Sequence, residues 1–277
     1  MTIGFNFAPF SKRYYSKKYC RNTQNSYLIF YHTMMFRQVL LACVCCFSTC
    51  LFAQKDTTFI EAHIDGLRPG WAKLIGTMGD QNYMIDSATV DQRGRFMLRK
   101  TPALLPGYYY FLLPDQRNFS FLIDKDRKVV FRANVADIGG TIHAEGSLDA
   151  EMFFETSRYQ AKFDPELKQT AETLQKVTLV DPAFAKAKVR QNEIIAERKA
   201  GLEAYYKKYP DLFFTKFKIA GQNPDLIDFK KPNGALDTMR QFNYYRDHFF
   251  DGVDFSDERL LYTPVVVNKL RRYMKEL

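Results

Sequence analysis

No cysteine follows Cys50 in this chain of 277 residues. The chain has five cysteines, and four of them, from Cys43 to Cys50, fall inside one apolar run. Residues 54–277 therefore contain no disulfide framework, no thiol nucleophile, no cysteine-ligated metal and no redox pair. Cys43 and Cys46 formally make a C-x-x-C motif, but the motif lies within the apolar run.

Motifs that indicate a reaction are equally scarce. The sequence has no G-x-S-x-G, Walker-type or dinucleotide-binding glycine pattern, and no spacing indicates a Ser/His/Asp arrangement. Three histidines follow residue 53, namely His63, His143 and His248. Neither His63 nor His143 has the H-x-H or H-x₃-H spacing of metal ligands, so we interpret them as structural or surface residues. We predict no catalytic, cofactor-binding or metal-ligating residue and no cofactor.

The apolar run itself has the layout of a secretory signal peptide. A single Arg37 precedes fifteen uncharged, mostly apolar residues, from Val39 to Ala53, and polar Gln54 follows. Fifteen residues are too few to span a bilayer, which takes about 20. We therefore predict a signal peptide at residues 34–53, with the working protein beginning near Gln54 and lying outside the cytoplasm.

Three alternatives remain for this N-terminal region. A lipoprotein signal with Cys43 as the lipid anchor is disfavoured, because only about five apolar residues separate Arg37 from that cysteine. A buried core helix is disfavoured because the run lacks polar positions at a 3.6-residue period. Residues 1–33 resemble a transit peptide in composition, but we interpret them as a non-native N-terminal extension of the gene.

Removal of the leader changes the charge of the protein. The whole chain has 40 Lys and Arg against 31 Asp and Glu, a formal net charge of +9. Residues 1–53 contain six of the basic residues and none of the acids, so 34 remain against 31 and the net charge falls to +3. Because nucleic-acid binding needs a clustered basic face, we expect no nucleic-acid partner. Contact with a membrane is expected only through the signal peptide.

Short apolar runs separated by turn residues fill residues 54–147. In the first run Ile60, Ala62 and Ile64 fall on one face, as in a half-buried strand. No segment of helical length interrupts the runs, which argues against a parallel sheet. We predict an antiparallel β-sandwich of about eight strands, at residues 59–65, 71–75, 83–90, 95–99, 108–113, 119–123, 129–133 and 141–143.

Residues 148–277 have helical spacing instead. Asp164-Pro165 and Asp181-Pro182 each predict a helix start, with an N-cap carboxylate before a proline at the first helical position. The second of these helices should be long and end at Pro210. Further helices are expected at residues 212–220, at 236–250 and after Thr263-Pro264. Four or five helices should pack as an all-helical, bundle-like domain. Its last apolar stripe ends at Leu277, so we expect this domain to be truncated.

Two groups of side chains are candidates for binding. The acids Asp247, Asp251, Asp254, Asp257 and Glu258 do not match a calcium loop, and we interpret Ser256 as a helix cap followed by acids in the first turn. The aromatic runs at residues 108–110 and 153–154 either line a ligand groove or, more commonly, pack in the core.

Several motifs together resemble a known family. The stretches FIEAHIDGL, YMIDSATVDQRGRFMLR and AEGSLDAEMFFE are similar to an N-terminal β-domain of unknown function, with matching features at Gly66, Ile85–Ala88, Gly94 and Gly146. Residues 148–277, above all HFFDGVDFSDERLLYTPVVVNKL, resemble the helical domain that commonly follows it. Proteins of this family are envelope thiol–disulfide interchange proteins of diderm bacteria, with a C-terminal thioredoxin-like domain (TlpA/ResA or AhpC/TSA type) that bears a C-x-x-C pair.

The resemblance implies a role for this chain without assigning a residue to it. The sequence ends where the thioredoxin-like domain should follow, so no catalytic residue of the family can be placed here. The expected function is that of a non-catalytic accessory module that presents a substrate or partner, in the periplasm or cell envelope. The expected partner is a thioredoxin-like domain or an envelope redox protein, and a full-length or partnered form would be a thiol–disulfide oxidoreductase. The alternative is an independent envelope module that binds a peptide, a glycan or an outer-membrane partner.

Overall fold

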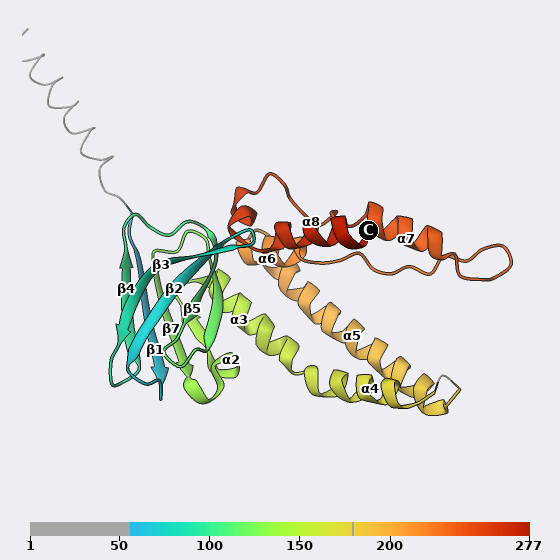
Figure 1. Ribbon diagram of the computed structural model, residues 1–277, viewed down its shortest axis with the longest axis horizontal. Helices are drawn as coiled ribbons and strands as arrows, with labels where there is room; N and C mark the ends of the chain where they lie inside the picture. The colour runs from blue at the N-terminus through green and yellow to red at the C-terminus, as the bar shows by residue number, and fades with distance from the viewer. Residues whose placement is uncertain (1–55, 179) are drawn as a thin grey trace, which may run out of the picture. The chain divides into compact units, whose positions relative to one another are not determined.

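The computed structural model describes residues 56–178 and 180–277 (Figure 1). The interpretations of residues 1–33 as an extension and of residues 34–53 as a signal peptide, with Cys43, lie outside these residues. Within the described part, no helix is both long enough and apolar enough to cross a membrane.

The first sheet contains one parallel pair of strands. Its order is β4-β1-β7-β8, with β1 at Thr58–Asp65, β4 at Arg95–Lys100, β7 at Lys128–Asn134 and β8 at His143–Glu145. β1 pairs with β7 in parallel, whereas the β1/β4 and β7/β8 pairs are antiparallel. The prediction of purely antiparallel pairing is therefore wrong at β1/β7. All four strands of the second sheet come between β1 and β7 in the chain, so β1 and β7 are not joined by a hairpin.

The second sheet is antiparallel throughout. Its order is β3-β2-β5-β6, with β2 at Gly70–Met78, β3 at Gln81–Val90, β5 at Gly107–Leu112 and β6 at Asn118–Ile123. The register between β2 and β3 shifts between Leu74 and Ile75, as at a β-bulge.

Side chains from both sheets meet in one apolar core. Alternate residues of each strand are buried, as a period of two requires. Phe111 of β5 lies 5.1 Å from Phe96 of β4 between ring centroids, and Phe121 of β6 lies 4.7 Å from Phe131 of β7. Full burial of one such ring stabilises the fold by about 1.5–3 kcal/mol.

The last strand begins later than the sequence suggested. Residues 135–141 form the 3₁₀-helix η1 (Val135–Asp137) and the short helix α2 (Ile138–Thr141). The Asp137 carboxylate caps α2 by accepting from the Gly140 N–H at 2.9 Å. The strand predicted at 141–143 is therefore displaced to His143–Glu145, and a helix of only four residues precedes it.

Six α-helices follow the sheets, rather than the four or five expected. They are α3 (Leu148–Ala161), α4 (Asp164–Lys176), α5 (Pro182–Lys208), α6 (Phe213–Ala220), α7 (Thr238–Asp247) and α8 (Val265–Glu276), with the 3₁₀-helix η2 at Glu258–Tyr262. α4 and α5 lie side by side (Figure 1) and are joined by the ion pair of Glu166 with Arg190.

The predicted caps were correct in one case and wrong in two. Asp181 caps α5, accepting from the Ala183 N–H at 2.8 Å, with proline next in the chain. Asp164 lies inside α4, whose N-cap is Phe163 and has no capping side chain. The α3–α4 connection is so short that Phe163 already has helical dihedral angles, which leaves no extended position for a cap. For η2 the cap is Asp257 rather than Ser256.

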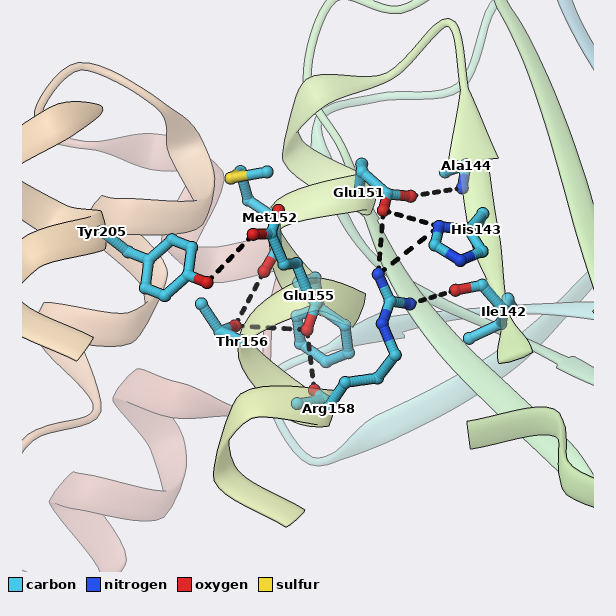
Figure 2. A network of polar contacts seen from close by, with 11 residues as sticks. Ile142, His143, Ala144, Glu151, Met152, Glu155, Thr156, Arg158 and Tyr205 are labelled. Carbon is cyan, nitrogen blue, oxygen red and sulfur yellow. Dashed lines mark hydrogen bonds and ion pairs between the residues drawn. The ribbon is translucent and has the colours of Figure 1, made fainter. Parts of the chain in front are cut away.

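Helix α3 joins the first sheet to the other helices. Figure 2 shows the Glu151 carboxylate accepting from the Ala144 N–H of β8 at 2.6 Å and pairing with Arg158 at 3.0 Å. On the other side of α3, Glu155 accepts from the Tyr205 hydroxyl of α5 at 2.9 Å.

The coarse fold prediction is confirmed: the protein is α+β, with two four-stranded sheets followed by helices. Asp56–Leu277 forms one compact unit.

Candidate functional site

The tyrosine run at residues 108–110 divides between the core and a surface cleft. Because β5 alternates, Tyr109 points into the core, and its hydroxyl donates to the Leu105 carbonyl at 2.5 Å. Burial raises the pKa of that hydroxyl well above its ordinary value. Tyr108 and Tyr110 lie on the opposite, outer face of the second sheet. Tyr109 therefore fits the core interpretation, whereas a ligand groove lined by Tyr108 and Tyr110 stays a prediction.

The pairing register places a regular set of side chains on this outer face. Tyr110 is flanked by Ile75 of β2 and Ser120 of β6, and Tyr108 is flanked by Leu122 of β6. One step in the other direction, Leu112 lies between Lys73 and Asn118. The face therefore mixes aromatic and aliphatic groups with small polar groups.

One end of this face is covered by η2 and α8. Gly79, in the tight turn between β2 and β3, donates its N–H to the Leu261 carbonyl at 3.1 Å. A Cβ at Gly79 would lie 2.8 Å from a methyl carbon of Val267, so glycine permits this close approach. Asp80 of the same turn pairs with Arg271 of α8 at 3.0 Å.

An open cleft of about 460 Å³ results between the sheet and α8. We call it the sheet–α8 cleft. Its sheet side is formed by Thr77, Asn82, Tyr108, Tyr110, Asn118 and Ser120, and its helix side by Pro264, Asn268 and Arg271. This volume lies within the range of about 300–1,000 Å³ that is typical of small-molecule sites.

Several polar groups of the cleft have no partner in the described part of the chain. The side chains of Tyr108, Tyr110, Asn118 and Ser120 make no hydrogen bond to another described residue. Thr77 and Asn82, by contrast, bond to each other at 3.0 Å. The cleft thus presents two phenol hydroxyls, an amide and an alcohol that are available to a ligand.

A second open cleft, of about 540 Å³, lies between α5, α6 and α7. His248 Nδ1 lies 2.6 Å from the carboxylate of Asp251, three residues later in the chain, and Lys199 pairs with Asp225 at 2.5 Å. The His248 ring also lies 4.2 Å from that of Tyr244. A histidine–carboxylate pair can move a proton, but no serine, threonine or cysteine lines this cleft to act as a nucleophile.

The acids predicted as a cluster near residue 250 are distributed among separate partners. Asp247 pairs with Arg246, Asp251 with His248, and Asp254 accepts from Ser256. Asp257 pairs with Arg259 at 2.7 Å, and this hydrogen-bonded ion pair lowers the pKa of the Asp257 carboxyl. Among the described residues, no group of three or more His, Cys, Asp or Glu could hold a metal ion.

His63 and His143, which are far apart in the sequence, lie on the same face of the first sheet. Both are paired in register with Arg132 of β7. His63 Nε2 lies 2.6 Å from the Glu61 carboxylate, and this hydrogen bond lowers the pKa of Glu61. His143 lies in the network of Glu151 and Arg158 (Figure 2).

The phenylalanine pair at 153–154 packs in the interior. Phe154 is buried among the rings of the sheet core. Phe153 packs against the stacked rings of Tyr108 and Phe217, with each ring centroid 6.2 Å away. These two residues fit the packing interpretation and do not line the sheet–α8 cleft.

Sequence reasoning missed a buried acid and a half-buried lysine in the helical region. Asp149 is 5% exposed and accepts from the Phe214 N–H at 2.6 Å. Burial outweighs this hydrogen bond and raises the pKa of Asp149 to about 6. Lys218 lies 4.6 Å from the Phe153 ring centroid, and burial lowers the pKa of its amine to about 8. An acid in the first turn of a helix and a lysine between aromatic residues gave no sign of burial in the sequence.

Comparison with known proteins adds no relative to this description: the chain matches no protein-family model and no curated protein.

Proposed function

We propose that this protein is a non-catalytic accessory module of a cell-envelope thiol–disulfide interchange protein, and that it presents a substrate or partner to a redox centre located elsewhere. The observation that carries the proposal is the position of the cysteines, all of which precede residue 54. Residues 54–277 therefore supply no thiol for the exchange reaction, whereas their open clefts offer surfaces for binding.

The residues that carry the family resemblance have structural roles consistent with this proposal. Gly94 has φ +70°, and a Cβ there would lie 2.0 Å from the Ile64 carbonyl oxygen. Gly146 has φ +87°, and a Cβ there would lie 2.3 Å from the Lys128 carbonyl oxygen. Only glycine fits such positions, so these glycines of the motifs determine the course of the backbone and supply no reacting group.

We further propose that the two sheets form a β-sandwich domain, at residues 54–147, followed by a helical domain at 148–277. The shared apolar core supports the sandwich, because rings from both sheets are in contact within it. A second apolar cluster, centred on α6, gathers residues of α3, α5, α6 and α8 together with Leu122 of β6, so it supports a helical core that packs against the second sheet.

Chemical cross-linking in the native envelope tests the accessory role. Lysine-reactive cross-linking followed by mass spectrometry should join this chain to a thioredoxin-like domain with a C-x-x-C pair. The domain can belong to the same polypeptide or to a partner. Cross-links only to proteins without a redox cysteine pair would contradict the proposal.

The sheet–α8 cleft favours a second candidate function, that of an independent envelope binding module. This module would bind its ligand without any redox partner. Its hallmark would be ligand binding by the isolated protein together with no cross-link to a thioredoxin-like domain.

A further inference from the structure

The sheet–α8 cleft has the chemistry of a site for an uncharged, hydroxyl-rich ligand. Among the residues that line it, only Asp80 and Arg271 are charged, and these two neutralise each other at 3.0 Å. The cleft therefore offers no unpaired charge to attract an acidic or basic ligand.

The hydrogen-bonding groups left free in the cleft fit sugar hydroxyls. Tyr108, Tyr110 and Ser120 have hydroxyl groups that can donate and accept, and Asn118 has an amide that does both. A sugar hydroxyl likewise donates and accepts, so each such contact can form in either direction. Asn118 and Ser120 belong to β6, an edge strand of this sheet, but their side chains project from the face of the sheet. A peptide that adds a strand would instead bond to the backbone of that edge.

An exposed aromatic platform accompanies these polar groups. Tyr110 lies half-buried in the cleft, and its ring packs against no other aromatic ring of the described residues. Trp71 is 58% exposed and lies on the same outer face, on the adjacent strand. It precedes Ile75, the neighbour of Tyr110, by four residues, which is about 13 Å along the strand. Flat rings of this kind cover the apolar C–H faces of sugars while their polar edges remain hydrated.

We infer that the sheet–α8 cleft binds a neutral oligosaccharide, with Tyr110 beneath one sugar ring and Trp71 in contact with a later unit of the same chain. The free hydroxyl and amide groups of Asn118 and Ser120 then bond to the sugar hydroxyls beside Tyr110. This site goes beyond the proposed accessory function and does not depend on it.

The single tryptophan of the chain gives a direct test. Because Trp71 lies on the proposed binding face, its fluorescence reports a ligand there without any label. The purified protein is titrated with cellohexaose, chitohexaose and maltohexaose, with a polygalacturonate oligomer as the acidic comparison, and with a tryptophan-free decapeptide library as the peptide comparison.

The expected result is a saturable change in Trp71 fluorescence with at least one neutral hexasaccharide, with a dissociation constant below about 1 mM. Tyr110→Ala should weaken binding about tenfold through loss of ring contact. Asn118→Ala, at an exposed position, should weaken it about fivefold without disturbing the fold. Met97→Ala is the matched control, because Met97 is 65% exposed on the other sheet and should leave binding unchanged.

Three results would overturn the inference: no binding of any neutral oligosaccharide, binding that survives both cleft variants, or tighter binding of the acidic oligomer or the peptides. Circular dichroism of each variant shows whether the fold is retained, and Asn118→Ala keeps the test valid if Tyr110→Ala unfolds. Failure here leaves the cross-linking to a redox domain unaffected, so the two proposals fail separately.

Discussion

The sheet region and the helical region bury different kinds of side chain. Within the described residues, the buried polar residues of the strands are two threonines, Thr58 and Thr77, and the rest of that core is apolar. Among the same described residues, Ser147 is buried at the cap of the first helix, and the helical region buries six further polar or charged residues: Asp149, Thr156, Thr170, Thr215, Thr263 and Lys269. The stability of the sheet region thus depends on apolar packing, whereas that of the helical region also depends on groups that titrate.

This difference follows from how the two regions are built. Strand pairing satisfies the backbone and leaves one face of each sheet free to be wholly apolar. Several helix ends of the helical region are instead held by side chains, such as Asp149 at the start of α6 and Lys269 at the Gln222 carbonyl after it. Polar side chains are therefore buried along with the helix ends. We expect pH to change the stability of the protein mainly through this region.

The largest effect is expected from the centre of the sheet core. Phe131 is fully buried and contacts rings from β5, β6 and α3. Phe131→Ala should lower the free energy of unfolding by about 3–5 kcal/mol, because it leaves a cavity among these rings. Chemical denaturation measures the loss, and Phe59→Ala, at an exposed ring of β1, should cost far less. Similar losses for both variants would mean that the sheet core is not tightly packed.

A smaller, pH-dependent effect is expected at Asp149. Its pKa in the folded protein, about 6, lies above the ordinary value of 3.8. The folded state thus binds this proton more tightly than the unfolded state, and stability falls as pH rises from about 4 to about 6. Asp149→Asn keeps an acceptor for the Phe214 N–H and removes the charge. It should raise the free energy of unfolding at pH 8 by about 2–3 kcal/mol and leave it unchanged near pH 4.

Urea denaturation at both pH values measures this effect, with Asp65→Asn as an exposed control. A loss of stability at pH 8 in Asp149→Asn would show that the Asp149 carboxylate is needed as an ion. The positive charge of Arg259, which acts to lower the pKa of Asp149, would then outweigh the cost of burying the carboxylate. The proposed contrast between the two regions would fail.

The smallest effect is expected at Lys218. Its pKa of about 8 lies below the ordinary 10.5, so the folded state is destabilised below pH 8 and regains stability as pH rises to about 10.5. Burial of this charge costs up to about 3 kcal/mol, and the contact with the Phe153 ring returns about 1–2 kcal/mol. Lys218→Met should therefore stabilise the protein at pH 7 by about 1 kcal/mol. Thermal unfolding measures the gain, with exposed Lys207→Met as the control. Destabilisation would mean that the cation–ring contact outweighs burial.

The sequence predicted local structure well and pairing poorly. Alternation located all eight strands of the described residues within a few residues, because a half-buried strand must alternate. Alternation could not indicate that β1 and β7 are parallel, since a strand alternates in the same way whether its neighbour runs parallel or antiparallel to it. The start of α4 was predicted correctly at Asp164-Pro165, but its cap was not, because Phe163 already has helical dihedral angles and Asp164 lies inside the helix.

The sheet–α8 cleft could be anticipated only in part. The tyrosine run left a groove and the core as alternatives, and alternation in β5 places Tyr109 in the core and Tyr110 on the outer face of the sheet. The other wall of the cleft comes from Arg271, which is 191 residues from its partner Asp80. No spacing within the sequence brings such distant residues together.

The most direct test of the accessory role is the reduction of insulin by this protein. The chain purified alone and the native assembly purified from the cell envelope are assayed side by side with a chemical reductant. The account predicts that the isolated chain stays at the rate of the buffer blank, that the assembly is active, and that alkylation of thiols abolishes this activity. Insulin reduction by a chain bearing only residues 54–277 would contradict the account, as would an assembly with no thiol-dependent activity.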